Sequence, residues 1–290
     1  MDYQRFIEEL PELYTNWGQD GLQPKSTKFA EVLDRIEGMT TPNVMQLLNF
    51  AVECIEEDEI YCEVGCYQGS TLIGALLNHQ HQLAYAVDSF AEFDREGKNQ
   101  AKLADNLAKF NLDEKVIFCN QDFEEFFFDL REIDPTTKIG VYLYDGAHDY
   151  RSQLLGLMLV KPFLAPRALI IVDDSNWSCV KQANWDFMAA NPECQLLLDL
   201  PTAKNGHRSF WNGIQVLSWD VNRPKIPSWK SFTNNFRDRN VIQSIYDLHF
   251  YFEFNKKPEI VQSLHLEADR LIEAGKLEAA EQKYFEALEW

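Results

Sequence analysis

Between residues 59 and 219, short apolar runs alternate with longer segments whose apolar positions recur at helical spacing. The apolar runs have the length of buried strands and occupy residues 61–64, 83–87, 116–119, 141–144 and 168–172. Helical spacing is seen between them, over residues 70–77, 99–110, 123–131 and 151–163. This alternation is typical of a parallel sheet covered by helices on both faces. We therefore predict an α/β fold for this part of the chain.

The alternation stops after the helix predicted over Trp177–Ala190. Two strand-like runs follow, Gln195–Leu198 and Gly213–Leu217, and the polar segment between them has no room for a crossover helix. Strands joined in this way pair as an antiparallel hairpin. The sequence therefore predicts a reversed strand in an otherwise parallel sheet.

The flanking segments have patterns of their own. Residues 1–58 show helical spacing over Tyr3–Leu13, Phe29–Ile36 and Asn43–Ile55, which predicts a helical cap beside the sheet. The cap is either scaffold or a lid that contacts substrate. Residues 223–257 contain prolines in a mixed sequence and are predicted to form a linker or lid. The domain between these flanks is assigned to residues 59–222.

Residues 258–290 form the last predicted unit. Small residues recur there at spacings that let two helices pack closely, at Ala268, Gly275, Ala280 and Ala287. This hairpin resembles one tetratricopeptide repeat. A single repeat cannot bury its own apolar face. We expect it to dock on the domain, on a second copy in a homodimer, or on a protein partner.

Composition narrows the class of ligand. With 27 Lys and Arg against 46 Asp and Glu, the net charge of −19 disfavours nucleic acid and anionic membranes as main partners. A small-molecule acceptor or substrate is favoured instead. The first 14 residues lack the apolar core of a secretory signal, and the apolar segment 154–172 is interrupted by charges and prolines. We expect a soluble, cytoplasmic protein.

The loop after the first strand of the domain carries the first candidate site. Gly65 is expected to turn with positive φ, and Gly69 to let a ligand or neighbouring backbone approach closely. Ser70 and Thr71 begin a helix whose free N–H groups favour an anionic group. Glu63 on the preceding strand would repel a pyrophosphate, and the G-x-x-x-G spacing is not that of a dinucleotide fingerprint, so an ammonium or sulfonium ligand fits better. Alternatively, the glycines only turn the chain.

Two further strand ends provide polar groups at the same edge. Asp88 follows the second strand, where an acid can accept hydrogen bonds from both hydroxyls of a ribose. After the third strand, Asp122 can accept from an exocyclic amine while Phe123 lies against an adenine ring. Equally, Asp122 only caps the helix that begins at Phe123.

The fourth and fifth strands deliver the reactive groups. Asp145 and His148 follow one strand, and Asp173 and Asp174 follow the next. Carboxylates crowded at neighbouring strand ends repel one another unless a proton or cation intervenes, so we expect a divalent metal such as Mg²⁺ at this edge. His148 is then a candidate base for a substrate hydroxyl. The alternative for each residue singly is helix capping.

These motifs together resemble the class I S-adenosylmethionine-dependent methyltransferases over residues 59–219. The Tyr144–Tyr150 segment with Val172–Asp174 resembles the macrocin-type sugar O-methyltransferases and, more distantly, the catechol-type enzymes. The resemblance implies a Rossmann-like, seven-stranded sheet with the last strand antiparallel. It implies S-adenosylmethionine as cofactor, held by Glu63, Gly65, Gly69, Ser70, Thr71, Asp88, Asp122, Phe123 and Asp145. The resemblance also implies Asp145, Asp173 and Asp174 as the metal ligands. His148 stands where the catechol enzymes have a catalytic lysine, and Asp174 where they have an asparagine.

The leading hypothesis is methyl transfer to an oxygen of a small hydroxylated metabolite or sugar, with Asp145 and His148 as catalytic residues. A second enzyme hypothesis keeps the Asp145, His148, Asp173 and Asp174 cluster for metal-dependent oxygenase or hydrolase chemistry. A third is a non-catalytic interaction protein on a methyltransferase scaffold. Binding of S-adenosylhomocysteine separates the first from the second.

Overall fold

The computed structural model describes residues 1–94 and 96–223, together with a few single positions between 267 and 283. The chain divides into two compact units, Met1–Ser228 and Trp229–Trp290. The linker predicted over 223–257 lies outside the described residues except at Arg223. The same holds for the hairpin 258–290 apart from those single positions, and both stay predictions.

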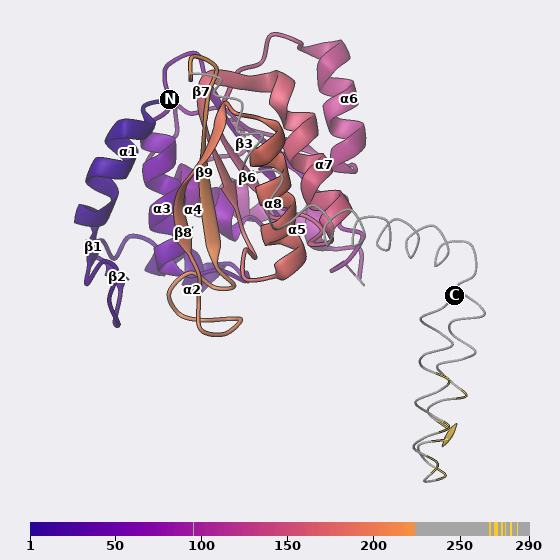
Figure 1. Cartoon of the computed structure of the whole chain (residues 1–290). Helices are drawn as coiled ribbons and strands as arrows, with labels where there is room; N and C mark the ends of the chain where they lie inside the picture. The colour runs from indigo at the N-terminus through magenta and orange to yellow at the C-terminus, as the bar shows by residue number, and fades with distance from the viewer. Residues whose placement is uncertain are drawn as a thin grey trace. The chain divides into compact units, whose positions relative to one another are not determined.

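A mixed seven-stranded sheet forms the centre of the first unit (Figure 1). Its spatial order is β5-β4-β3-β6-β7-β9-β8. The strands are β3 (Ile60–Val64), β4 (Ala84–Val87), β5 (Val116–Cys119), β6 (Ile139–Tyr144), β7 (Leu164–Val172), β8 (Cys194–Leu200) and β9 (Ile214–Asp220). The five strands from β3 to β7 pair in parallel, as predicted.

The last strand runs against the others. β9 pairs antiparallel with β7, with Ile170 opposite Leu217, and antiparallel with β8, with Leu196 also opposite Leu217. The hairpin inserts its second strand between β7 and β8, so the reversed strand lies inside the sheet and not at its edge. This confirms the predicted Rossmann-like sheet with an antiparallel final strand.

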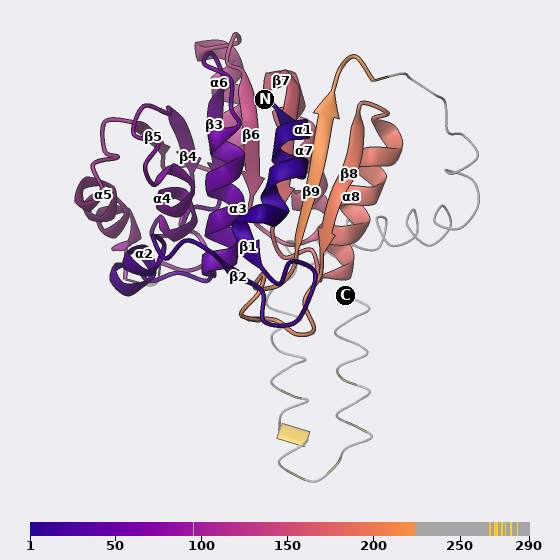
Figure 2. The same cartoon turned by 90° about the vertical axis from the view of Figure 1, so that its left-hand side faces the viewer.

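Helices cover both faces of the sheet, and Figures 1 and 2 show α1 (Tyr3–Glu9), α3 and α4 on one face, with α6, α7 and α8 on the other. Their bounds are α2 (Ala30–Arg35), α3 (Pro42–Glu53), α4 (Ser70–Leu76), α5 (Asn99–Lys109), α6 (Phe123–Ile133), α7 (Tyr150–Val160) and α8 (Ser178–Ala190), with a 3₁₀ turn at Lys161–Phe163. α3 begins as predicted, because Thr41 caps it by accepting from the Val44 N–H (3.2 Å) and Pro42 occupies its first turn.

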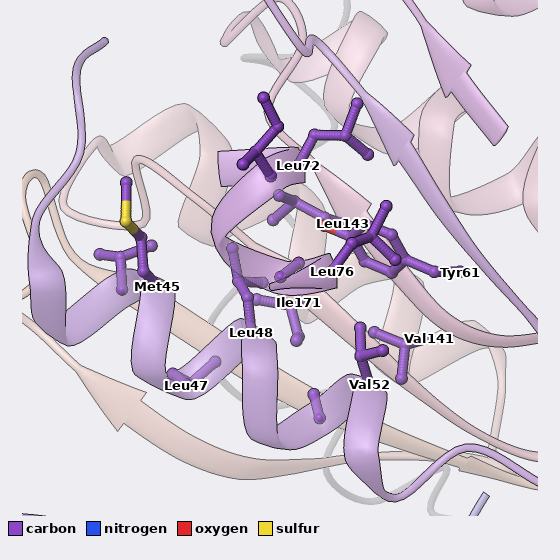
Figure 3. Close-up of a cluster of buried hydrophobic side chains, with 14 of the residues drawn as sticks. Met45, Leu47, Leu48, Val52, Tyr61, Leu72, Leu76, Val141, Leu143 and Ile171 are labelled. Carbon is purple, nitrogen blue, oxygen red and sulfur yellow. The ribbon is translucent and has the colours of Figure 1, made fainter. Parts of the chain in front are cut away.

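Successive residues along each strand point to opposite faces of the sheet, so the hydrophobic core consists of two clusters, one on each face. Tyr61, Leu143 and Ile171 point to the α3 and α4 face, where Leu48 and Leu72 meet them (Figure 3). Each such buried leucine stabilises the fold by roughly 1.5–3 kcal/mol relative to its exposed state. The neighbouring strand positions belong to the second cluster, which packs beneath α6, α7 and α8.

The N-terminal segment differs in detail from its prediction. The helix predicted over Tyr3–Leu13 is α-helical only from Tyr3 to Glu9 (α1), and Leu10–Leu13 form a 3₁₀ turn because Pro11 cannot continue the ladder. A small antiparallel pair follows, β1 (Tyr14–Thr15) with β2 (Gln23–Pro24). Strands of two residues are too short to show any alternation in sequence.

Among the described residues, no helix has both the length and the apolarity needed to cross a membrane.

Candidate active site at the carboxyl ends of the strands

Backbone hydrogen bonds join the loops that follow β3, β4, β6 and β7. The Gly65 N–H donates to Val87 O (2.8 Å), and the Asp145 N–H donates to Val64 O (2.9 Å). The Asp173 N–H donates to Tyr144 O at 3.2 Å. The glycine loop, Asp145 and Asp173 therefore lie at one edge of the sheet, as the parallel topology predicts.

In the glycine loop, residues 65–69, every second residue has a left-handed backbone conformation. Gly65 has φ +87°, Tyr67 +45° and Gly69 +88°, so the positive φ predicted at Gly65 is confirmed. A Cβ on Gly65 would overlap the backbone carbonyl of Asp145, and a Cβ on Gly69 would come within 2.8 Å of the Leu103 side chain. Close packing against the Asp145 backbone requires glycine at residue 65. At residue 69 the neighbour is the tip of a flexible leucine side chain, and the positive φ favours glycine.

Glu63 lies beneath this loop and is fully buried. One carboxylate oxygen accepts the Tyr61 hydroxyl and the other accepts the Thr71 hydroxyl, each at 2.6 Å. Burial raises the pKa of Glu63 to about 7, although both hydrogen bonds lower it. Glu63 thus anchors the start of α4 from below, and its carboxylate does not face solvent.

Asp88 connects two loops at the tip of β4. Its carboxylate accepts the Tyr67 N–H and the Phe90 N–H, both at 2.7 Å. Burial raises the pKa of Asp88, and the two backbone donors partly offset this rise. Each oxygen receives one of these N–H groups and keeps a second lone pair for another donor.

The other predicted cofactor residues have varied surroundings. Ser70 and Thr71 are buried, and a Cβ on Gly38 would overlap the Ser70 side chain, so the segment before α3 lies against the start of α4. Asp122 is exposed and caps α6 by accepting the Glu124 N–H (2.8 Å). Phe123 is buried edge-on against Tyr144, with ring centroids 5.7 Å apart. The capping alternative for Asp122 is therefore observed, and the adenine contact stays a prediction.

Asp145, His148 and Asp174 converge beyond β6 and β7. One ligand atom from each lies within 4.8 Å of the others. His148 Nε2 is 2.6 Å from Asp174 Oδ2. Within residues 1–94 and 96–223, His148 Nδ1 and Asp174 Oδ1 are buried without a hydrogen-bond partner. Unsatisfied polar atoms are rare in native interiors, and two of them in one cluster favour a bound ligand.

Asp173 does not join this group. Its Oδ1 accepts the Asp174 N–H at 2.8 Å, and the side chain is buried. Asp174 itself has φ +54°, a left-handed conformation that turns its carboxylate toward His148. The set of three that the structure brings together therefore differs from the predicted metal set of Asp145, Asp173 and Asp174, because His148 takes the place of Asp173.

Crowding of negative charge sets the electrostatics. Burial, together with repulsion from Asp173 and Asp174, raises the pKa of Asp145 far above its usual range. Burial and the neighbouring Asp174 raise the pKa of Asp173 to about 8. Burial alone would lower the pKa of His148, but the hydrogen bond and charge of Asp174 outweigh it, so the pKa is raised. The cluster favours a proton or a cation.

Sequence reasoning missed Trp177. Its ring is 41% exposed and lies edge-on to the His148 ring, with centroids 5.2 Å apart. The Trp177 N–H donates to Asp174 O (3.0 Å), which fixes the tryptophan beside the cluster. The only signal in the sequence was a tryptophan three residues after Asp174.

Comparisons with known proteins agree with this architecture. Residues 62–175 match the family described as a methyltransferase domain. The fold is similar to an O-methyltransferase from Bacillus cereus in complex with SAH (14% identity, 74% of this chain and 100% of that chain covered, TM-score 0.52). It is also similar to a putative O-methyltransferase from Klebsiella pneumoniae (16% identity, 68% of this chain and 91% of that chain covered, TM-score 0.50). A third similar structure is cofactor-bound Rv0187 from MTB (14% identity, 75% of this chain and 95% of that chain covered, TM-score 0.50).

No curated protein is significantly similar to the chain in sequence. At these identities the solved structures establish the fold, and the family match covers residues 62–175 of the 290. The glycine loop, Asp88, Asp145 and Asp173 all lie within the matched residues. Residues 62–175 are thus similar to a methyltransferase domain, and they lie within a Rossmann-like, seven-stranded sheet.

Proposed function

We propose that the protein transfers a methyl group from S-adenosylmethionine to an oxygen of a small hydroxylated metabolite or sugar. One observation carries the proposal: a glycine loop with its acid, Asp88, lies at the same sheet edge as the Asp145, His148 and Asp174 cluster. This arrangement supports the proposal, because a cofactor bound at the loop would lie next to groups that can accept a proton.

The cofactor would be held by residues of the first three strand ends. Asp88 fits a ribose, because each carboxylate oxygen keeps a lone pair after accepting its backbone N–H. Glu63 holds Thr71 and the start of α4 in place. The wider proposed set comprises Gly65, Gly69, Ser70, Asp122, Phe123 and Asp145.

The acceptor would be activated at the cluster. S-adenosylmethionine, when bound, supplies a methyl group on a positively charged sulfur, so the protein must align the acceptor and remove its proton. His148 is the proposed proton acceptor, and Asp174, 2.6 Å away, stabilises the imidazolium that results. A divalent cation such as Mg²⁺ on the acids would lower the pKa of the hydroxyl. The buried, unpartnered Asp174 Oδ1 supports such a site.

Calorimetry with S-adenosylhomocysteine tests the cofactor. We expect saturable binding to the full chain, weakened at least about tenfold in Asp88→Asn because one acceptor is lost. Asp113→Asn, which changes an exposed acid before β5, is the matched control. Absence of binding with and without Mg²⁺ would overturn the proposal. It would favour the metal-dependent oxygenase or hydrolase alternative, which keeps the same cluster.

A second assay identifies the acceptor class. Sugars and aromatic diols are incubated with S-adenosylmethionine, and S-adenosylhomocysteine release and methylated products are measured by mass spectrometry. Methylation of an oxygen supports the proposal, and methylation only of nitrogen or carbon contradicts the oxygen acceptor. The proposed homodimer or partner contact through residues 258–290 is tested separately by sedimentation. A monomer whose profile is unchanged by deleting that segment removes it.

A further inference from the structure

We propose that His148, and not Asp173, is the third protein ligand of a divalent cation held by Asp145 and Asp174, and that this nitrogen ligand makes the site prefer a transition-metal ion to Mg²⁺. The inference deepens the proposed function, since it concerns the same site. Metal binding can nevertheless be measured without methyl transfer.

Distances within the cluster carry the first step. Ligand atoms of Asp145, His148 and Asp174 all lie within 4.8 Å of one another, and His148 Nε2 and Asp174 Oδ2 are 2.6 Å apart. Protein ligands bind such ions at about 2.0–2.2 Å, so two ligands of one ion are separated by at most about twice that length. That limit is about 4.4 Å, so a shift of about 0.4 Å or less brings the three atoms within reach of one ion.

Unsatisfied groups carry the second step. The Asp174 side chain is 9% exposed, and its Oδ1 has no hydrogen-bond partner among the described residues. A buried carboxylate oxygen without a donor is costly, and a cation removes that cost. This observation is independent of the distances, because it concerns the carboxylate oxygen that does not contact His148.

Asp173 is engaged elsewhere. Its Oδ1 accepts the Asp174 N–H at 2.8 Å, which holds the turn in which Asp174 has φ +54°. Asp173 thus acts as a positioning residue for Asp174. Its carboxylate is absent from the group of ligand atoms that the described residues bring together.

The donor set decides the class of ion. Two carboxylates and one imidazole include a nitrogen, whereas Mg²⁺ prefers oxygen ligands and keeps several waters. Imidazole suits first-row transition ions, whose affinity for nitrogen and oxygen ligands exceeds that of Mg²⁺. While His148 ligates an ion it is not the proton acceptor proposed above for the metal-free site. The ion then lowers the pKa of the bound hydroxyl, and the proton is released to water.

Titration of the metal-free full chain with Mn²⁺ and Mg²⁺ tests the inference. Calorimetry gives the affinities, and electron paramagnetic resonance of bound Mn²⁺ reports its ligands. We expect Mn²⁺ to bind at least about tenfold more tightly than Mg²⁺, and His148→Ala to weaken Mn²⁺ by at least about tenfold. His148→Asp would give the site only oxygen ligands, so it should reduce the ratio of the Mn²⁺ affinity to the Mg²⁺ affinity. Asp173→Asn, which keeps an oxygen acceptor for the Asp174 N–H, should bind Mn²⁺ within about threefold of the wild type.

Control measurements separate metal binding at this cluster from metal binding elsewhere, from loss of folding and from cofactor binding. His79 and His81 lie with ring centroids 6.2 Å apart and offer a competing imidazole pair, so His81→Ala should leave the measured Mn²⁺ affinity unchanged. Equal Mn²⁺ and Mg²⁺ affinities would overturn the inference, as would an Asp173→Asn variant that loses binding while His148→Ala retains it. Circular dichroism verifies folding. S-adenosylhomocysteine binding is measured on the same samples and tests the proposed function separately. Failure of metal binding would not affect that result, and failure of S-adenosylhomocysteine binding would not affect the metal result.

Discussion

Gly65 and Asp145 meet so closely that the backbone carbonyl of Asp145 occupies the space a side chain at residue 65 would need. The Asp145 N–H also donates to Val64 O, one residue before Gly65 (2.9 Å). The proposed cofactor loop and the acid cluster are therefore in direct backbone contact.

Gly65→Ala tests this contact. We expect it to lower the free energy of unfolding by about 1–3 kcal/mol beyond the cost of a left-handed alanine, because the new Cβ collides with Asp145. Gly97→Ala is the matched control, since Gly97 has φ +66° and open space around its missing Cβ. Urea denaturation measures both. Equal losses in the two variants would show that conformation, and not the collision, determines the cost.

Glu63 should make stability depend on pH. Its folded pKa of about 7 exceeds the ordinary value of 4.5, so between these values the folded state binds more protons than the unfolded state. Stability should therefore fall as pH rises through that window. The full effect is about 3 kcal/mol above pH 7.

The isosteric variant Glu63→Gln isolates this contribution. The glutamine side chain cannot ionise, so the stability of the variant relative to the wild type should increase between pH 5 and pH 8, as measured by urea denaturation at both values. Glu132→Gln, at an exposed position on α6, should show no such difference. A pH-independent difference for Glu63→Gln would contradict the raised pKa.

Trp177 should contribute to acceptor binding. Its exposed ring lies beside His148, so an acceptor bound at the cluster can pack against it. We expect Trp177→Ala to raise the acceptor KM by about fivefold or more, which corresponds to about 1 kcal/mol, with a smaller change in kcat. Trp185→Ala is the matched control, because Trp185 is 42% exposed on α8 and has no ring contact with the cluster among the described residues. Similar KM values for the two variants would rule out this role.

Asn49 should be important for stability. Its buried amide donates to the carbonyl oxygens of Gly74, Ala75 and Leu77 at 2.8–3.1 Å, and so pairs the free groups at the end of α4. Asn49→Ala should reduce the free energy of unfolding by about 2–3 kcal/mol, because these carbonyls lose their donor. Asn205→Ala, at an exposed loop position, should change stability by less than about 0.5 kcal/mol. A small effect of Asn49→Ala in thermal and urea unfolding would show that water replaces the amide.

Local patterns were sufficient to predict the sheet and its order of elements. The strand runs, the helix start at Pro42 and the reversed final strand follow from residue spacing and from the short polar connection before Gly213. Those features depend on neighbours in sequence, and the structure confirms them. The pair β1–β2 was missed because two-residue strands have no period to detect.

Side-chain direction at the strand ends required the tertiary structure. Glu63 shares a strand face with Tyr61, two residues away, and the packing of α4 on that face buries its carboxylate. His148 joins Asp145 and Asp174 in place of Asp173, because a left-handed residue at 174 and a backbone hydrogen bond at 173 redirect the two carboxylates. The sequence by itself determined which residues reach this edge of the sheet, since strand periodicity is local. Only the folded chain decided which of them meet, because that depends on loop conformation and on contacts between segments far apart in sequence.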